Sequence, residues 1–198
     1  MYLLIRIVRR GLVLILRSLD ARGLGDEVHE KVCLVGFFFC GILPSGGCQA
    51  APEMLPAPVM GYNHTSSSIN WFTVNGAGGP DIGPNQGGGS QVCCSAVPRH
   101  WNSELRAVVE WEVDPEPYSS ADWSEPTFSD EWRARMKAQR KTYTRHKAVV
   151  EIPRYDNPGP LRVHFLPCNQ VRVAAAATSP GYPGYPYNYP MRDMPCKS

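Results

Sequence analysis

The sequence lacks a net charge large enough to specify a partner. Its 198 residues include 20 basic and 18 acidic side chains, a formal charge of +2, and from Cys48 onward the two signs are balanced at 14 each. A neutral surface does not release the condensed counterions that supply most of the affinity for nucleic acids. The composition therefore argues against DNA or RNA as the partner.

The sequence also lacks the local motifs of common enzymes and metal sites. It contains no G-x-S-x-G elbow, no G-K-[ST] or G-x-G-x-x-G phosphate loop, and no C-x-x-C or H-x-x-x-H metal pair. Residues 76–90 hold seven glycines but lead to Cys93 and Cys94 rather than to a helix, which indicates a structural or partner-contacting loop. We therefore predict a protein that is not an enzyme, with no catalytic residues, no cofactor and no metal ion.

Long apolar runs are missing as well. Residues 1–16 are interrupted by three arginines and residues 32–43 form a charge-free run of only twelve, whereas a transmembrane helix needs about 20 residues. A run of twelve is typical of the hydrophobic core of a signal peptide. Gly46 and Gly47 before Cys48 resemble the lipobox of bacterial lipoproteins, in which the cysteine carries the lipid, and Gln49 resembles the sorting signal for the outer membrane. We therefore expect an outer-membrane lipoprotein that faces the periplasm and is anchored in the membrane through Cys48.

The alternative for this leader is cleavage by ordinary signal peptidase near residues 47–51, because Ser45 stands where most lipoboxes have Leu or Val. A signal peptide normally begins close to its hydrophobic core, but 31 residues precede Val32. We interpret residues 1–47 as the leader: residues 1–27 as an extension from a mis-assigned start and residues 28–47 as the lipoprotein signal peptide. A tether over 48–58, a folded domain over 59–175 and a Pro/Tyr-rich tail over 176–198 are expected to follow.

Four cysteines remain after the leader and the lipid site: Cys93, Cys94, Cys168 and Cys196. In an oxidising compartment they favour disulfides, for which three pairings are possible. Neighbouring cysteines are the least favoured pair, so we expect a bridge from the end of the glycine-rich segment to Cys168. The alternative is a thiol-dependent envelope enzyme in which Cys93 or Cys94 works with a histidine base, the candidates being His64, His100 and His164.

Alternation of apolar and polar residues predicts a mainly β (α+β) fold. Residues 105–113 alternate strictly, as in a half-buried strand of an antiparallel sheet. Residues 69–74, 147–152 and 161–165 show shorter patterns, with a turn at 157–160, and weaker candidates are residues 59–62, 91–96 and 170–174. We therefore predict an antiparallel sheet or sandwich of about 6–7 strands.

One helix is predicted over residues 129–141. Ser129 is a suitable N-cap, Asp130 and Glu131 suit the positive end of the helix dipole, and Arg140 and Lys141 suit the negative end. A sparse apolar stripe leads us to expect that this helix packs one face on the sheet.

Charge segregates around the start of the predicted helix. Residues 104–131 hold nine acidic side chains and one basic one, whereas residues 133–147 hold seven basic side chains and none that is acidic. An acidic segment with aromatic residues has the composition of a protein interface. The candidate partner-binding residues are Glu116, Tyr118, Asp122, Trp123 and Glu125, with Asp81 and Asn85 of the glycine-rich segment as a second group. The alternative is that the aromatic residues of this segment, which include Phe128, cap the sheet.

Several short motifs resemble a known family when taken in order. They include Gly61-Tyr62-Asn63-His64-Thr65, Phe72-Thr73-Val74-Asn75-Gly76, Cys93-Cys94, Val109-Glu110-Trp111 and Val163-His164-Phe165. Together they resemble the domain of unknown function numbered 3304, which is found in proteobacterial lipoproteins, and the resemblance covers about residues 57–175.

The resemblance implies a function, because members of that family are encoded beside type VI secretion phospholipase effectors and are regarded as their immunity proteins. It implies a periplasm-facing lipoprotein that binds and inhibits a cognate secreted phospholipase, and it brings no catalytic residues with it. A structural or accessory envelope lipoprotein is the alternative, and it predicts no toxin partner.

Overall fold

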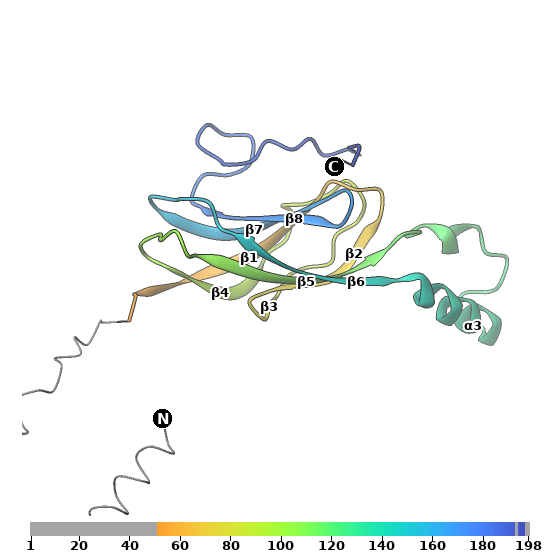
Figure 1. Ribbon diagram of the computed structural model, residues 1–198. Helices are drawn as coiled ribbons and strands as arrows, with labels where there is room; N and C mark the ends of the chain where they lie inside the picture. Colours follow the sequence, from red (N-terminus) through yellow and green to blue (C-terminus); the bar gives the residue numbers. More distant parts are fainter. Residues whose placement is uncertain (1–50, 193, 197–198) are drawn as a thin grey trace, which may run out of the picture. The chain divides into compact units, whose positions relative to one another are not determined.

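The fold is described here from a computed structural model for residues 51–192 and 194–196 (Figure 1), so the expected leader and the lipid site at Cys48 lie outside the described residues. Within those residues the chain forms eight strands, one α-helix and two short 3₁₀ helices. They are β1 (Met54–Asn63), β2 (Ser68–Val74), β3 (Ala77–Gly78), β4 (Val92–Pro98), β5 (Arg106–Asp114), η1 (Ser119–Asp122), α3 (Asp130–Gln139), η2 (Arg140–Thr142), β6 (Thr144–Glu151), β7 (Pro158–Leu166) and β8 (Gln170–Ala176). The prediction of a mainly β fold is confirmed.

Two strands begin earlier than the sequence pattern indicated. β1 starts at Met54, so residues 54–58, expected to lie in the tether, already pair with β4. β7 starts at Pro158, inside the expected turn, and Pro158 pairs with Ala176 of β8. Proline is tolerated at the first position of a strand because its missing N–H breaks no interior bond of the ladder.

The strands form two four-stranded sheets, with the orders β4-β1-β7-β8 and β3-β2-β5-β6. The second sheet is antiparallel, but the first is mixed, because β1 and β7 run parallel. The expectation of a purely antiparallel arrangement is therefore wrong. The chain between β1 and β7 passes through the whole second sheet, and a crossover of that length permits a parallel pair where a tight hairpin would not.

Side chains from both sheets share one hydrophobic core. The alternation along β5 buries Ala107, Val109 and Trp111 on one side of the strand. Phe165 of β7 packs against Phe72 of β2 with 5.1 Å between ring centroids, and against Trp111 with 5.9 Å. These aromatic contacts join the sheet that contains β7 to the sheet that contains β2 and β5.

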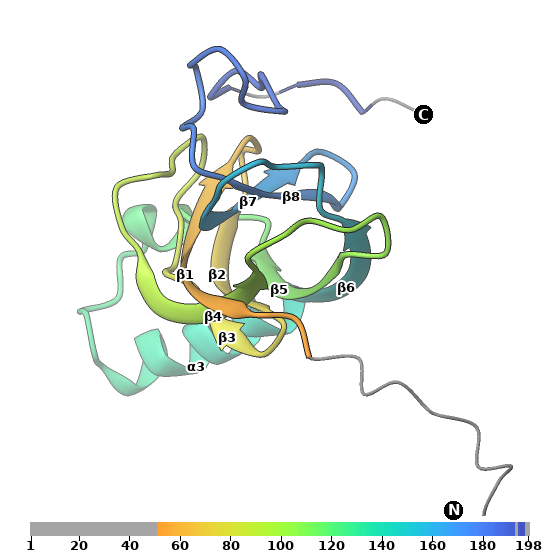
Figure 2. The ribbon, with the colours of Figure 1, turned by 90° about the vertical axis from the view of Figure 1, so that its left-hand side faces the viewer.

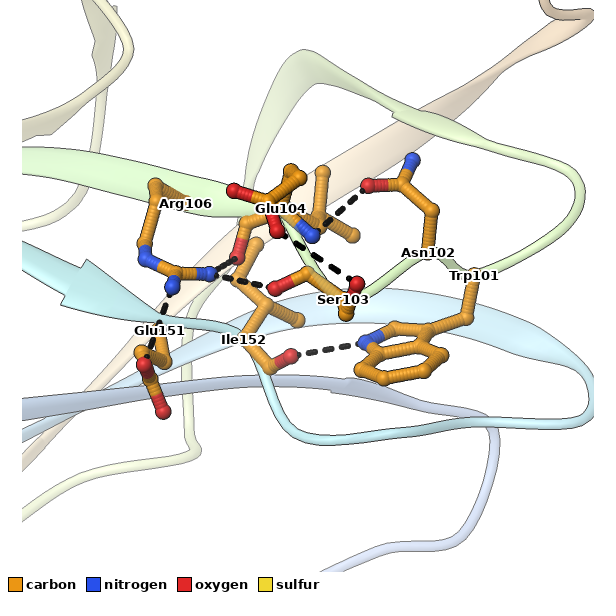
Figure 3. A network of polar contacts seen from close by, with 8 residues as sticks. Trp101, Asn102, Ser103, Glu104, Arg106, Glu151 and Ile152 are labelled. Atoms are coloured by element: carbon orange, nitrogen blue, oxygen red, sulfur yellow. Dashed lines mark hydrogen bonds and ion pairs between the residues drawn. The ribbon is translucent and has the colours of Figure 1, made fainter.

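The connection from β4 to β5 is fastened to the end of β6 (Figure 3). The indole Nε1 of Trp101 donates a hydrogen bond to the carbonyl of Ile152 at 2.9 Å. Arg106 donates to the carboxylate of Glu151 at 3.0 Å and to the carbonyl of Ser103 at 2.8 Å. These bonds fix one end of the second sheet. The long insertion between β5 and β6 leaves the sheet at its other end.

The predicted helix is present, but it does not pack on a sheet. Ser129 caps it as expected, because its Oγ accepts a hydrogen bond from the backbone N–H of Trp132 at 3.1 Å. None of the residues of α3 is buried, and the helix projects beyond the ends of β5 and β6 (Figure 1). Its apolar stripe is too narrow to cover a sheet, so the expectation of a packed helix is wrong.

The structure pairs Cys93 with Cys94 and Cys168 with Cys196, the latter with a Cα–Cα distance of 5.7 Å. The prediction that these four cysteines form disulfides is confirmed, but the expected bridge to Cys168 from Cys93 or Cys94 is wrong. β4 carries the first pair at one edge of its sheet, whereas Cys168 adjoins β8 at the other edge. Strands about 4.8 Å apart place β1 and β7 between them, beyond the reach of a disulfide.

The chain after β8 crosses the outside of the first sheet as an extended segment. We call residues 177–192 and 194–196 the C-terminal strap. In Figures 1 and 2 the strap lies over β7 and β8, and the Cys168–Cys196 disulfide attaches its end to the turn between these strands. Among the helices in the described part of the chain, none is long and apolar enough to span a membrane.

Candidate interaction surface

The predicted partner-binding residues around Trp123 lie on a projecting insertion, residues 115–143, which we call the β5–β6 arm. It leaves the second sheet after Asp114 and returns at Thr144, which pairs with Val113. The buried carboxylate of Asp114 accepts a hydrogen bond from the backbone N–H of Glu116 at 2.9 Å. The amide of Gln139 donates to the carbonyl of Glu116 at 3.0 Å. These bonds close the base of the arm onto the sheet.

The aromatic side chains of the arm pack on one another. Trp132 of α3 meets Phe128 and Trp123 edge to face, with centroid distances of 5.3 Å and 6.4 Å. The guanidinium of Arg135 lies 4.6 Å from the Trp123 ring and donates to both carboxylate oxygens of Glu125 at 3.0 Å. Hydrogen bonds from the backbone N–H of Glu125 and from Arg135 hold the pKa of that carboxyl below its usual value. Trp123 and Glu125 therefore support the arm from within.

Two aromatic side chains of the arm are left facing solvent. Tyr118 is 65% exposed and Phe128 is 67% exposed. Phe128 also has a φ of 69°, in the left-handed region that bulky side chains rarely adopt. None of the arm's aromatic residues belongs to the buried core, so they do not cap the sheet. Phe128 lies in the acidic aromatic segment that the sequence favoured as an interface but was not among its candidate contact residues, and its exposure in the folded arm adds it to the candidates.

The glycine-rich segment has a structural role. Its backbone runs along β1 just before β4 begins, with the N–H of Gly88 donating to the carbonyl of Gly61 at 3.0 Å. A Cβ atom at Gly87 would lie 2.5 Å from the Cα of Tyr62 and 2.6 Å from the carbonyl oxygen of Gly61. This close approach of two backbones requires glycine at position 87.

The structure brings the two predicted groups to the same end of the second sheet. Ile69 exchanges two backbone hydrogen bonds of 2.9 Å with Ile82 of the glycine-rich segment, and it pairs with Val113 on its other side. Two strand spacings, about 10 Å, therefore separate the glycine-rich segment from the root of the arm. Asp81 is exposed beside Ile82, and both Asp81 and Asn85 line a hollow of about 450 Å³.

A hollow reaches the hydrophobic core at this same end of the second sheet. This hollow of about 360 Å³ is lined by hydroxyl side chains such as Thr65 and Ser67, by Trp111 and Phe165 of the core, and by Met194 of the strap. It offers apolar surface with a polar rim, which is the make-up of a pocket that accepts an anchoring side chain of a partner. The arm, the glycine-rich segment and this hollow together form the candidate interaction surface.

The residues of the thiol-enzyme alternative are occupied by other contacts. Cys93 and Cys94 are bonded to each other, and His64 and His164 are buried and hydrogen-bonded to each other at 2.9 Å. His100 is exposed. Within the described residues, no group of three or more His, Cys, Asp or Glu side chains is arranged to hold a metal ion.

Comparison with protein families gave one match. The model of the family described as "Protein of unknown function (DUF3304)" matches residues 62–173, which include the second sheet, the arm, the glycine-rich segment and most of the first sheet apart from β1. Comparisons with curated proteins and with solved structures gave no match. The match spans more than half of the chain, and the chain therefore belongs to the DUF3304 family of proteins of unknown function.

Proposed function

We propose that this protein is a periplasm-facing lipoprotein that binds a type VI secreted phospholipase and neutralises it. The observation that carries the proposal is the β5–β6 arm, which projects from the sheets and presents Tyr118 and Phe128 to solvent. Burying two aromatic side chains costs little conformational entropy, because each has only two side-chain torsions, and such residues dominate the binding energy of protein interfaces. The resemblance to immunity proteins supplies the class of partner.

The proposed mechanism is steric and involves no turnover by this protein. A phospholipase must admit lipid through an open active-site mouth, and a complementary surface placed over that mouth is sufficient to stop it. The arm reaches outward to contact the enzyme, while the hollow at its root takes an apolar side chain of the partner. Acidic residues along the arm speed encounter with a basic surface.

The direct test is a phospholipase assay with the effector encoded by the neighbouring gene. Equimolar protein should abolish hydrolysis of phospholipid vesicles, and the two proteins should form a one-to-one complex. Undiminished hydrolysis at a large molar excess of this protein would end the proposal and would favour the structural envelope role instead.

The exposed aromatic residues should account for much of the affinity. Replacing both Tyr118 and Phe128 with alanine is expected to weaken binding about 10- to 100-fold, since each truncation removes buried aromatic area at the interface. Neither side chain contributes to the buried core, so the unfolding midpoint in urea should stay unchanged. The matched control is Tyr182→Ala, which removes an aromatic residue of similar exposure, 69%, from the strap. Equal affinities of the double variant and the control would place the contact elsewhere.

The acidic side chains should act mainly on the association rate. We expect Glu116→Gln with Asp122→Asn to slow association roughly tenfold at low salt and to flatten its dependence on salt, while dissociation changes little. Glu125 is left out because its ion pair with Arg135 supports the arm. Stopped-flow association at several salt concentrations measures the effect. The matched control is Glu104→Gln, an exposed acidic residue of the connection before β5, and an equal effect of the control would show that only net charge matters.

Attachment to the membrane should depend on Cys48. If this thiol carries acyl chains, each buried methylene contributes roughly 0.8 kcal/mol to membrane binding, so Cys48→Ser should move the protein from the membrane fraction to the soluble periplasmic fraction. Fractionation with an antibody against the folded domain measures the distribution. A substituted protein that still sediments with the outer membrane would contradict the lipid anchor.

A further inference from the structure

We propose that the C-terminal strap is an acid-released cover over the outer face of β1 and β7: it stays closed while His64 and His164 are neutral, and it opens when this pair takes up protons. Opening exposes a surface of Tyr62, His164 and Arg162 that the strap otherwise occupies. The inference concerns the outer face of β1 and β7 and does not depend on the proposed phospholipase partner.

The Cys168–Cys196 disulfide and the hydrogen bonds that Arg162 donates to Thr178 and Ser179 hold parts of the strap. Further polar contacts of the strap converge on two buried histidines. The hydroxyl of Tyr185 lies 2.6 Å from Nε2 of His164, and the carbonyl oxygen of Pro190 lies 2.9 Å from Nδ1 of His64. Nε2 of His64 and Nδ1 of His164 are 2.9 Å apart. Both histidines are 1% exposed, so an unbroken chain of hydrogen bonds runs from one part of the strap through the pair to another part.

Which atoms donate and which accept in this series of hydrogen bonds follows from the bond to Pro190. A carbonyl oxygen only accepts, so Nδ1 of His64 must carry the hydrogen and Nε2 of neutral His64 must accept. Nδ1 of His164 therefore donates to His64, Nε2 of His164 accepts, and the hydroxyl of Tyr185 donates to it. Each nitrogen of the neutral pair then has one matched partner, which fully satisfies both buried rings.

Aromatic rings surround His164 on the remaining sides. Tyr62 stacks on it with 4.9 Å between centroids, and three tyrosines of the strap have centroids 5.6–5.7 Å from it: Tyr185, Tyr187 and Tyr189. This packing leaves His164 only 1% exposed. A charged imidazole in this place loses its hydration and gains no carboxylate partner among these neighbours.

The charged groups on neighbouring elements oppose protonation. Arg162 of β7 is buried beside the pair and lies 5.8 Å from the Tyr185 ring, and Arg172 of β8 is the cross-strand partner of His164. Glu151 of β6 acts on Tyr187 and is paired with Arg106. Tyr185 and Tyr187 stay neutral, because burial raises the pKa of both hydroxyls, that of Tyr187 to about 12.

Protonation also changes the hydrogen bonds. One added proton enters at Nε2 of His164 if the Tyr185 hydroxyl turns from donor to acceptor, while His164 continues to donate to His64. A second proton would set two N–H groups against each other between the rings. The doubly charged pair therefore does not fit the closed strap, whereas the open strap lets water solvate the charged rings.

The direction of the pH dependence follows from the pKa values. Burial first, and then the charges of His64 and Arg162, lower the pKa of His164 to about 3, and burial lowers that of His64. A histidine whose pKa is lower in the closed state favours closure fully above its ordinary pKa of about 6.5 and loses this preference as the pH falls toward 3. Falling pH between about 6.5 and 3 therefore shifts the equilibrium toward the open strap.

Hydroxyl-radical footprinting of the full chain, read by mass spectrometry, tests the proposal. At pH 7.5 the rings of Tyr185, Tyr187 and Tyr189 should oxidise more slowly than Tyr182, which is 69% exposed in the same strap. At pH 4.5 their rates should approach that of Tyr182 and return on neutralisation, while buried Tyr155 stays protected. Strap tyrosines that remain protected at pH 4.5 would overturn the proposal, as would loss of protection at Tyr155 in step with them, because that is global unfolding.

Variants assign the response to the histidine pair. The double variant His64→Gln, His164→Gln has no titrating ring in the site and should show the same strap reactivity at both pH values, whether its strap is open or closed. The matched control His100→Gln replaces an exposed histidine and should keep the native response. A native response in the double variant, or its loss in the control, would overturn the assignment. If the double variant does not fold, footprinting of the native protein still tests the proposal, because the opening of its strap must occur between pH 6.5 and 3.

Discussion

Replacing Phe165 with alanine is expected to lower the free energy of unfolding by about 3–5 kcal/mol, the range for truncating a fully buried aromatic residue. Phe165 is 2% exposed and contacts both Phe72 and Trp111 of the opposite sheet. Its removal leaves a cavity where the two sheets meet, and the strands around it are too well paired to collapse into it. Urea denaturation followed by tryptophan fluorescence measures the loss.

Val149→Ala is the matched control for this prediction. Val149 lies on β6, is 64% exposed and also loses methyl groups on replacement, so its effect should stay within about 0.5 kcal/mol. If Phe165→Ala cost no more than this control, the two sheets would not depend on a shared core, and the arrangement described above would be wrong.

Removing the Cys168–Cys196 bridge, with serine at both positions, should lower the free energy of unfolding by about 3–4 kcal/mol. The two cysteines are 28 residues apart in the sequence, and the chain-entropy model gives roughly this value for a loop of that length. The loss arises because the unfolded chain regains the freedom that the closed loop denies it. Denaturation of both proteins under non-reducing conditions measures the difference.

The second disulfide provides the control. The Cys93–Cys94 bridge joins adjacent residues and closes almost no chain, so serine at both of these positions should cost less than about 1 kcal/mol by the same reasoning. Equal losses from the two double variants would contradict the entropic account. Free thiols at all four positions in protein isolated from the periplasm would contradict both pairings.

The elements predicted from the sequence are those whose cause lies within a few residues. The strict alternation along residues 105–113 predicted β5 because adjacent side chains in a strand point to opposite faces. Ser129 predicted the start of α3 because an N-cap acts on the N–H groups of the next turn. Local rules of this kind also located the other strands, with errors at their ends, except for the two-residue β3 in the segment interpreted as a loop.

The packing position of the helix could not be predicted from local rules. Its sequence determined that α3 forms, but what it packs against depends on which surfaces lie within reach. β5 and β6 carry the arm away from the sheets, and Trp132 packs against Trp123 and Phe128 of the arm. The fold of the arm also gives its predicted contact residues different roles. Trp123 and Glu125 support the arm, whereas Tyr118 faces solvent.

The sequence by itself determined most of the strands, the capped helix and the presence of disulfide-bonded cysteines. Only the tertiary structure decided that β1 and β7 run parallel, that Cys168 bonds to Cys196, and that His64 meets His164 across 100 residues of chain. The physical reason is that these contacts depend on strand order and on the path of the strap. Both are set by how the whole core packs, and no short stretch of sequence contains that information.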